Sequence, residues 1–84
     1  MNSKQAKALQ AIFAEPTRAN VAWADIENLL IALGCELIEG NGSRARFVFK
    51  GEVETFHRPH PAKEAKRYQV RAARDFLTRI GVKP

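Results

Sequence analysis

The stretch Arg44-Ala45-Arg46-Phe47-Val48-Phe49-Lys50-Gly51-Glu52-Val53-Glu54-Thr55-Phe56-His57 has the pattern of a β-hairpin. Its first half alternates: Ala45, Phe47 and Phe49 would lie on one face, with mostly polar side chains on the other. Strict alternation of this kind is typical of a strand that is buried on one side only. Gly51-Glu52 is a suitable two-residue turn, because a type II′ turn favours glycine at its first position. The stretch therefore predicts two antiparallel strands whose apolar face the rest of the chain has to cover.

The turn sets the register of the two strands. Arg46 then faces His57 on the open face, and Phe47 faces Phe56 on the buried one. Residues 50–53 could instead form a longer turn, which would change the cross-strand neighbour of His57. In the first register, three side chains able to bind phosphate or transfer a proton share the open face: Arg44, Arg46 and His57. This cationic face with a histidine is the main indication of function in the chain.

Helical patterns lie on both sides of the hairpin. Apolar residues at every third or fourth position predict helices over residues 3–14, 24–33 and 68–80. Ser3 is the predicted N-cap of the first helix. Residues 35–39 predict a short strand with Leu37 or Ile38 turned inward.

The resulting order is helix, helix, strand, strand, strand, helix. We therefore expect an α+β fold in which helices cover one face of a three-stranded antiparallel sheet. The chain has 84 residues, of which 45% are hydrophobic, and this suffices for one small domain with one core. Trp23 and Cys35 are expected to be core residues.

Several classes of protein are not indicated. The single cysteine excludes an internal disulfide, and no group of Cys and His residues has the spacing of a zinc site. His57 and His60 lack a third ligand, so we expect neither a metal nor another cofactor. The sequence has no Ser-His-Asp set, P-loop or dinucleotide-binding motif. It has no apolar run that could span a bilayer and no signal peptide, so we expect no membrane association and a cytoplasmic location.

The net charge of +5 is concentrated in the second half of the chain. Residues 1–42 carry three basic and five acidic side chains, whereas residues 43–84 carry eleven basic and four acidic ones. This asymmetry predicts an anionic partner, either a nucleic acid or an acidic protein. The simplest alternative is that the charge only keeps the protein in solution.

The predicted open face has the groups that RNA cleavage needs. Cleavage beside a 2′-hydroxyl requires a general base, a general acid and cations that stabilise the phosphorane charge. Histidine can transfer protons near neutral pH, and arginine binds phosphate through paired hydrogen bonds. His57 is either such a proton-transfer group or an exposed strand residue without a role. His60 is expected to pack in a proline-rich turn.

A resemblance to a known family supports this interpretation. The run from Ile26 to Phe47, with the form I-x-x-L-L-x-x-L-G-C-E-L-I-x-G-x-G-S-R-x-R-F, resembles the HicA toxins of bacterial toxin–antitoxin pairs. Pro59-His60-Pro61, the basic spacer after it and the helix ending at Ile80-Gly81 are similar to the same family. The resemblance covers about residues 24–82.

The resemblance implies a double-stranded-RNA-binding-domain-like α-β-β-β-α fold, here over residues 21–84. The helix and loop of residues 1–20 are similar to the N-terminal extension of a longer branch of the family, and the whole chain is expected to form a single domain. The family also implies a small ribonuclease that cleaves mRNA and arrests growth. Its implied partner is the HicB antitoxin, which masks the active face.

One departure of the sequence from the family matters for function. HicA toxins open the second strand with Gly-Ser-His, and that histidine is catalytic, whereas here Gly42-Ser43 is followed by Arg44. Arginine keeps its proton in proteins and is a poor general base. We therefore expect His57 to transfer the proton while Arg44 and Arg46 hold phosphate. The residues expected to bind nucleic acid are Ser43, Arg44, Arg46, Lys50, Arg58, Lys66, Arg67, Arg71 and Arg74.

Two other functions are consistent with the sequence. A HicA-like module that has lost catalysis would still bind RNA or its antitoxin, and the arginine at position 44 favours this alternative. A purely protein-binding adaptor would use the basic face for an acidic partner and would not bind RNA even at low salt. Cleavage of RNA separates the ribonuclease from both alternatives.

Overall fold

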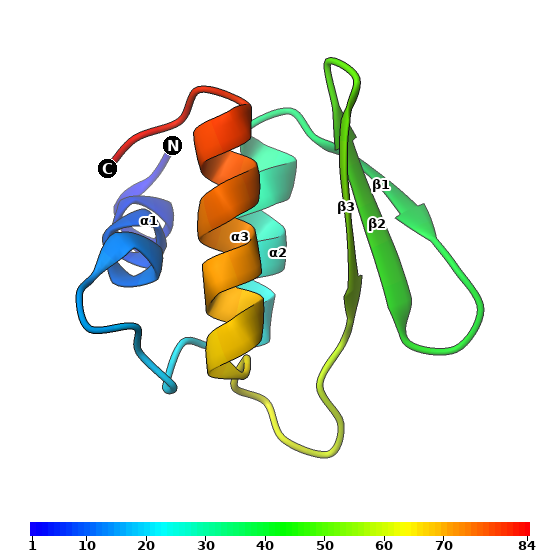
Figure 1. The fold of residues 1–84 in the computed structure, drawn as a ribbon, viewed down its shortest axis with the longest axis horizontal. Coiled ribbons are helices and arrows are strands. Elements are labelled where there is room, and N and C mark those ends of the chain that lie inside the picture. The colour runs from blue at the N-terminus through cyan, green and yellow to red at the C-terminus, as the bar shows by residue number, and fades with distance from the viewer.

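The computed structural model describes residues 1–84 and has three helices and one three-stranded sheet (Figure 1). In chain order the elements are α1 (Ser3–Phe13), α2 (Trp23–Ala32), β1 (Glu36–Glu39), β2 (Arg44–Phe49), β3 (Glu52–His57) and α3 (Arg67–Arg79). The strands are antiparallel with β2 in the centre, so the expected α+β order α-β-β-β-α after an N-terminal helix is confirmed. None of the helices has both the length and the apolar character needed to cross a bilayer.

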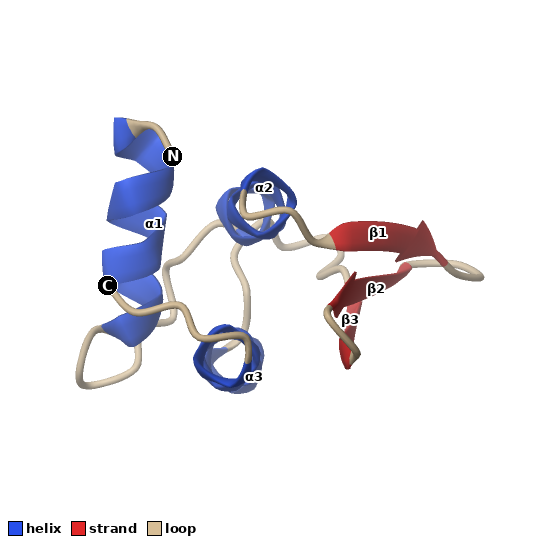
Figure 2. Cartoon of the chain, turned by 90° about the horizontal axis from the view of Figure 1, so that it is seen from above, coloured by secondary structure: helices blue, strands red, loops and turns tan.

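The elements form three layers, which Figure 2 shows from above: α1, then α2 with α3, then the sheet. The sheet turns one face to α2 and α3 and leaves the other uncovered. An aromatic cluster lies between α2 and the sheet. The ring centroids of Phe47 and Phe56 are 5.9 Å apart, and those of Trp23 and Phe56 are 5.1 Å apart. Trp23 and Cys35 are buried, as predicted, and burial raises the pKa of the Cys35 thiol.

Helix α1 packs on the side of α2 and α3 that faces away from the sheet (Figures 1 and 2). It buries Ala8, Leu9 and Ile12, so it contributes to the same continuous core as the sheet. The predicted N-cap was one residue too late. Asn2 is the N-cap, because its side chain accepts the Gln5 N–H at 2.9 Å and the Gln5 side chain accepts the Asn2 N–H at 3.0 Å.

Arg74 of α3 holds the C-terminal end of α1. Its guanidinium donates to the carbonyl oxygens of Ile12 and Ala14, each at 3.0 Å, and to the Glu15 carboxylate at 2.8 Å. The last carbonyls of a helix lack partners within the helix, and a cation there also interacts favourably with the helix dipole. Arg74 therefore stabilises the contact between α1 and α3.

The hairpin turn is formed by Lys50 and Gly51, so the predicted turn at Gly51-Glu52 was wrong. Lys50 has a φ of 50° and Gly51 a φ of 84°, and positive φ at both positions is the type I′ geometry that matches the twist of a hairpin. In this register Arg44 faces His57. The predicted pairing of Arg46 with His57 was therefore wrong, although a shift of two residues leaves every side chain on its predicted face.

Two further details follow from the same register. Phe47 pairs with Glu54 rather than with Phe56, yet the two phenyl rings still pack against each other, diagonally across the strands. In β1, Leu37 is half-buried and Ile38 is exposed, so Leu37 is the residue that turns inward.

Candidate active site and nucleic-acid interface

Arg44 is the first residue of the central strand β2 and lies on the open face of the sheet. The Gly40 N–H donates to the Arg44 carbonyl on the β1 side, and His57 pairs with Arg44 on the β3 side. A Cβ atom on residue 40 would lie only 2.9 Å from the Arg44 Cβ, so glycine leaves the space that the arginine side chain occupies. Arg46 lies further along β2, where its neighbours are Ile38 and Thr55. Arg44, Arg46 and His57 are all exposed.

Arg44 and His57 form the kind of strand pair in which side chains come closest. The Arg58 N–H donates to the Ser43 carbonyl at 2.9 Å, which makes Ser43 and Arg58 a hydrogen-bonded pair. In an antiparallel ladder such pairs alternate with non-hydrogen-bonded ones, so Arg44 and His57 are of the second type. Side chains in these pairs are close enough to act on one bound group.

His57 also lines a pocket of about 250 Å³ at the end of the hairpin. The pocket lies between Ser43, the end of β3, the loop that follows it and the first turn of α3; its lining includes Ser43, His57, His60, Lys66 and Tyr68. The Gln69 side chain donates to the His57 carbonyl at 2.7 Å and thereby ties the strand end to α3. His60 is exposed in this pocket, so its expected packing role was wrong.

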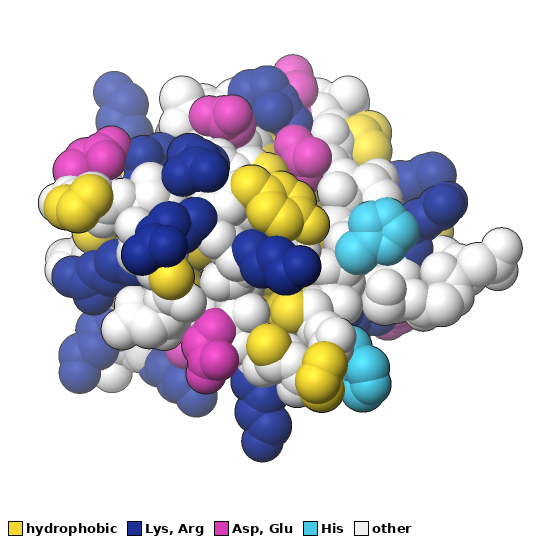
Figure 3. Space-filling model, turned by 60° about the horizontal axis from the view of Figure 1, so that its bottom comes forward, with side chains coloured by type: hydrophobic (Ala, Val, Ile, Leu, Met, Phe, Trp, Pro, Cys, Tyr) yellow, Lys and Arg dark blue, Asp and Glu magenta, His cyan; other side chains and the backbone are white.

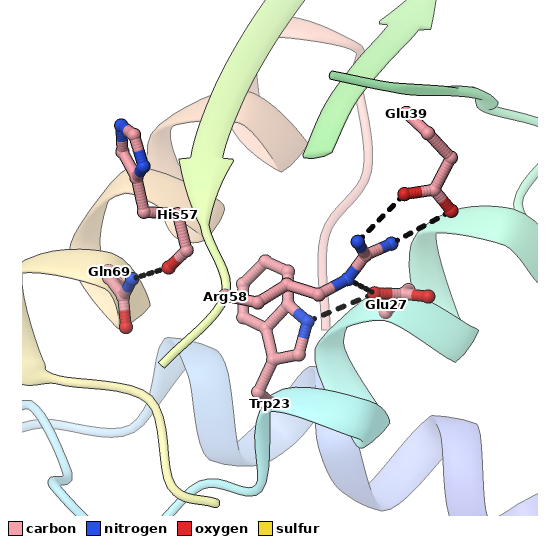
Figure 4. Close-up of polar contacts among 6 residues, drawn as sticks. All are labelled: Trp23, Glu27, Glu39, His57, Arg58 and Gln69. Carbon is pink, nitrogen blue, oxygen red and sulfur yellow. Dashed lines mark hydrogen bonds and ion pairs between the residues drawn. The ribbon is translucent and has the colours of Figure 1, made fainter. Parts of the chain in front are cut away.

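Arg58 leaves β3 on the side opposite to His57 (Figure 4). Its Nε donates to Glu27 of α2 at 3.0 Å, and its two terminal nitrogens donate to Glu39 at 2.7 and 3.1 Å. The Trp23 indole donates to the same Glu27 oxygen at 3.0 Å. These hydrogen bonds lower the pKa of Glu39 and raise the pKa of Arg58. Arg58 therefore joins the end of β3 to α2 and β1, and each of its three guanidinium nitrogens already makes a hydrogen bond.

We expect Arg58→Met to destabilise the fold. The variant leaves the half-buried Glu27 carboxylate with the Trp23 indole as its remaining hydrogen-bond donor, and an under-satisfied charge of this kind costs about 1–3 kcal/mol of unfolding free energy. Urea denaturation followed by circular dichroism measures the loss. Lys63→Met is the matched control, because Lys63 is exposed and forms no salt bridge. Equal midpoints for the two variants would contradict the role of Arg58.

The other basic residues predicted to bind nucleic acid fall into three groups. Arg67 donates to the Thr17 carbonyl at 3.3 Å and Arg74 holds α1, so both face the connection between α1 and α2. Lys66 and Arg71 are exposed and their side chains have no salt bridge or hydrogen-bond donation within the chain. Lys50 lies at the hairpin tip, with its ammonium 5.3 Å from the centroid of the Phe49 ring. Figure 3 shows the face below the hairpin, where Lys and Arg side chains gather around exposed hydrophobic ones beside two histidines.

A family model described as the HicA toxin of bacterial toxin–antitoxin systems matches residues 23–82. The chain belongs to the HicA toxin family. Comparison with curated proteins found no match, and comparison with solved structures found none either. The HicA match begins at the first residue of α2 and includes all three strands and α3, so the open sheet face and the pocket both lie within it.

In this HicA chain the open face and the pocket meet at His57. Two imidazoles in one pocket can accept and donate protons, and the cations at positions 44, 46 and 66 can bind phosphate. No group of three or more Cys, His, Asp or Glu side chains converges as a metal site would require. The sequence predicted roles for His57 and Arg44, but it did not indicate that His60, Lys66 and Tyr68 share the pocket with His57. The one local signal was an aromatic residue within the basic run of residues 66–71.

Proposed function

We propose that this HicA-family chain is a toxin that cleaves mRNA in the cytoplasm and thereby arrests growth. The observation that supports the proposal most strongly is the position of His57, which faces Arg44 across the hairpin and lines a pocket with His60 and Lys66. A proton-transfer group is thus flanked by phosphate-binding cations on two sides. Membership of a toxin family supports the biological role.

The proposed reaction is transesterification at an RNA phosphate. His57 takes the proton of the 2′-hydroxyl, and the 2′-oxygen attacks phosphorus. The bond from phosphorus to the 5′-oxygen breaks, and that oxygen receives a proton from a general acid, for which His60 is in the same pocket. The products are a 2′,3′-cyclic phosphate and a 5′-hydroxyl. Arg44 and Arg46 stabilise the additional negative charge of the phosphorane, as fixed cations do in a preorganised site.

The proposed protein partner is a HicB antitoxin that covers the open face of the sheet. Besides Arg44 and Arg46, this face exposes Ile38 and Val53, the latter to 48%. Exposed apolar side chains next to unpaired cations are a suitable surface for a protein with an acidic rim. Occupation of this face would also block access of RNA to His57.

A second candidate function is an RNA- or antitoxin-binding module without catalysis. The observation that favours it is Arg44, which stands where the family motif has its histidine. Both candidates bind RNA more weakly as salt rises, because both release counterions from phosphate. Only the ribonuclease cleaves the RNA.

Inducible expression in growing bacteria tests the toxin function. We expect growth arrest within minutes to hours of induction, together with fragmentation of mRNA, and rescue when the cognate HicB protein is co-expressed. Sustained growth, at a level of the chain verified by immunoblot, would contradict the toxin. Growth arrest with intact mRNA would contradict the ribonuclease and favour the binding module.

A further inference from the structure

Tyr68 is the most exposed aromatic side chain of the protein, at 57%. Trp23, Phe47, Phe56 and Phe76 are buried, and the two remaining phenylalanines are half-buried against the core. Tyr68 packs against none of these rings, and its hydroxyl makes no hydrogen bond within the protein. The fold therefore does not need this ring for its stability.

The position of Tyr68 connects the pocket with the basic surface of α3. It is the second residue of α3 and lines the pocket that contains His57, His60 and Lys66. Arg71 lies one helical turn further along α3, on the same side as Tyr68, and is exposed. An exposed aromatic ring between cations is the combination that single-stranded nucleic acids bind, with the bases on the ring and the phosphates on the cations.

We propose that Tyr68 stacks on an unpaired base of the RNA next to the phosphate that reaches His57. The proposal rests on the proposed ribonuclease function and names its substrate: RNA that is single-stranded at the cleavage site. A base within a duplex is stacked on both sides and offers no face to a side chain, whereas bases in loops and single strands do. The substrate is therefore an unpaired segment, although the fold resembles a domain that binds double-stranded RNA.

RNA affinity measured by fluorescence anisotropy tests the stacking. For a short single strand we expect Tyr68→Ala to weaken binding about 5- to 100-fold, since a stacked base contributes roughly 1–3 kcal/mol. Tyr68→Phe and Tyr68→Trp should keep the affinity, because both retain a ring. Ile31→Ala is the matched control: Ile31 is similarly exposed but lies on α2, outside the pocket. The same RNA annealed to its complement should bind more weakly than the single strand.

Abasic scanning identifies the stacked base. In wild type, removing one base at a time should reduce affinity sharply at a single position, and in Tyr68→Ala that position should no longer stand out. Equal affinities of wild type and Tyr68→Ala, tighter binding of the duplex, or no binding of single strands by wild type would each overturn the stacking. If binding depends on Tyr68 but wild type leaves the RNA intact, the stacking stands and the ribonuclease function fails.

Discussion

His57→Ala is expected to reduce RNA cleavage about 100- to 10,000-fold while RNA binding changes little, because a positioned proton-transfer group contributes about that factor. His57 lies at the end of β3, opposite Arg44 and inside the pocket, whereas the phosphate-binding cations are on other residues. Loss of the imidazole therefore removes the base without removing the cations. Cleavage rates and affinities on the same labelled RNA separate the two effects.

Thr55→Ala is the control for His57→Ala. Thr55 is on the same strand and the same open face, is exposed, and has Arg46 as its neighbour. Both variants should unfold at the same urea concentration as wild type, since both side chains are exposed. Full cleavage by His57→Ala would show that the proton-transfer group lies elsewhere. If Thr55→Ala lost cleavage to the same extent as His57→Ala, the loss would not be specific to the imidazole.

The largest loss of stability is expected for Phe47→Ala. Phe47 is fully buried on the central strand, and its ring centroid is 5.9 Å from that of Phe56 and 6.5 Å from that of Trp23. Truncation of a buried phenylalanine costs about 3–5 kcal/mol of unfolding free energy, because apolar contacts are lost and a cavity remains. A domain of this size has about 5–15 kcal/mol in total, so the variant should be close to unfolding.

Urea denaturation measures the effect of Phe47→Ala against Val53→Ala. Val53 is on the same hairpin but is half exposed on the open face, so its truncation should shift the midpoint only slightly. The aromatic cluster joins α2 to both strands of the hairpin. Similar midpoints for the two variants would contradict the central place of this cluster in the core.

The faces of the hairpin could be predicted from the sequence, but its register could not. Alternation has a period of two, so Phe47 and Phe56 have to be inside and Arg44 and His57 outside in any register that keeps the apolar face buried. The same period makes a shift of two residues invisible. The turn decides between such registers, and here Lys50 adopts a positive φ, which a lysine rarely does.

Contacts between distant segments limited the prediction of the site. Arg58 and Arg74 have the same local signature as the other basic residues, yet their carboxylate partners lie far away in the sequence, at Glu27 and Glu15. The structural role of these two arginines, an ion pair with a distant carboxylate, is therefore visible only in the folded chain. The pocket likewise forms where the segment after β3 meets the first turn of α3, so local patterns could not bring His60 and Tyr68 together with His57.

The N-terminal helix shows a similar limit. Its apolar positions predicted a buried face, but they did not indicate what that face would contact. Helix α1 lies outside the HicA match, yet it shares the core through Ile12 and is held by Arg74 of α3. Its contact with α2 and α3 lies on the side away from the sheet, so the open sheet face stays uncovered (Figure 2).

Cleavage of a labelled single-stranded RNA by the purified chain, in the presence of EDTA, tests the central claim most directly. The same RNA with one 2′-deoxy substitution at the cleavage site serves as the matched substrate. We predict that the all-ribose RNA is cut to a 2′,3′-cyclic phosphate and a 5′-hydroxyl and that the substituted site remains intact, because the nucleophile is the 2′-oxygen. Binding without cleavage of either RNA, or equal cleavage of both, would contradict the account.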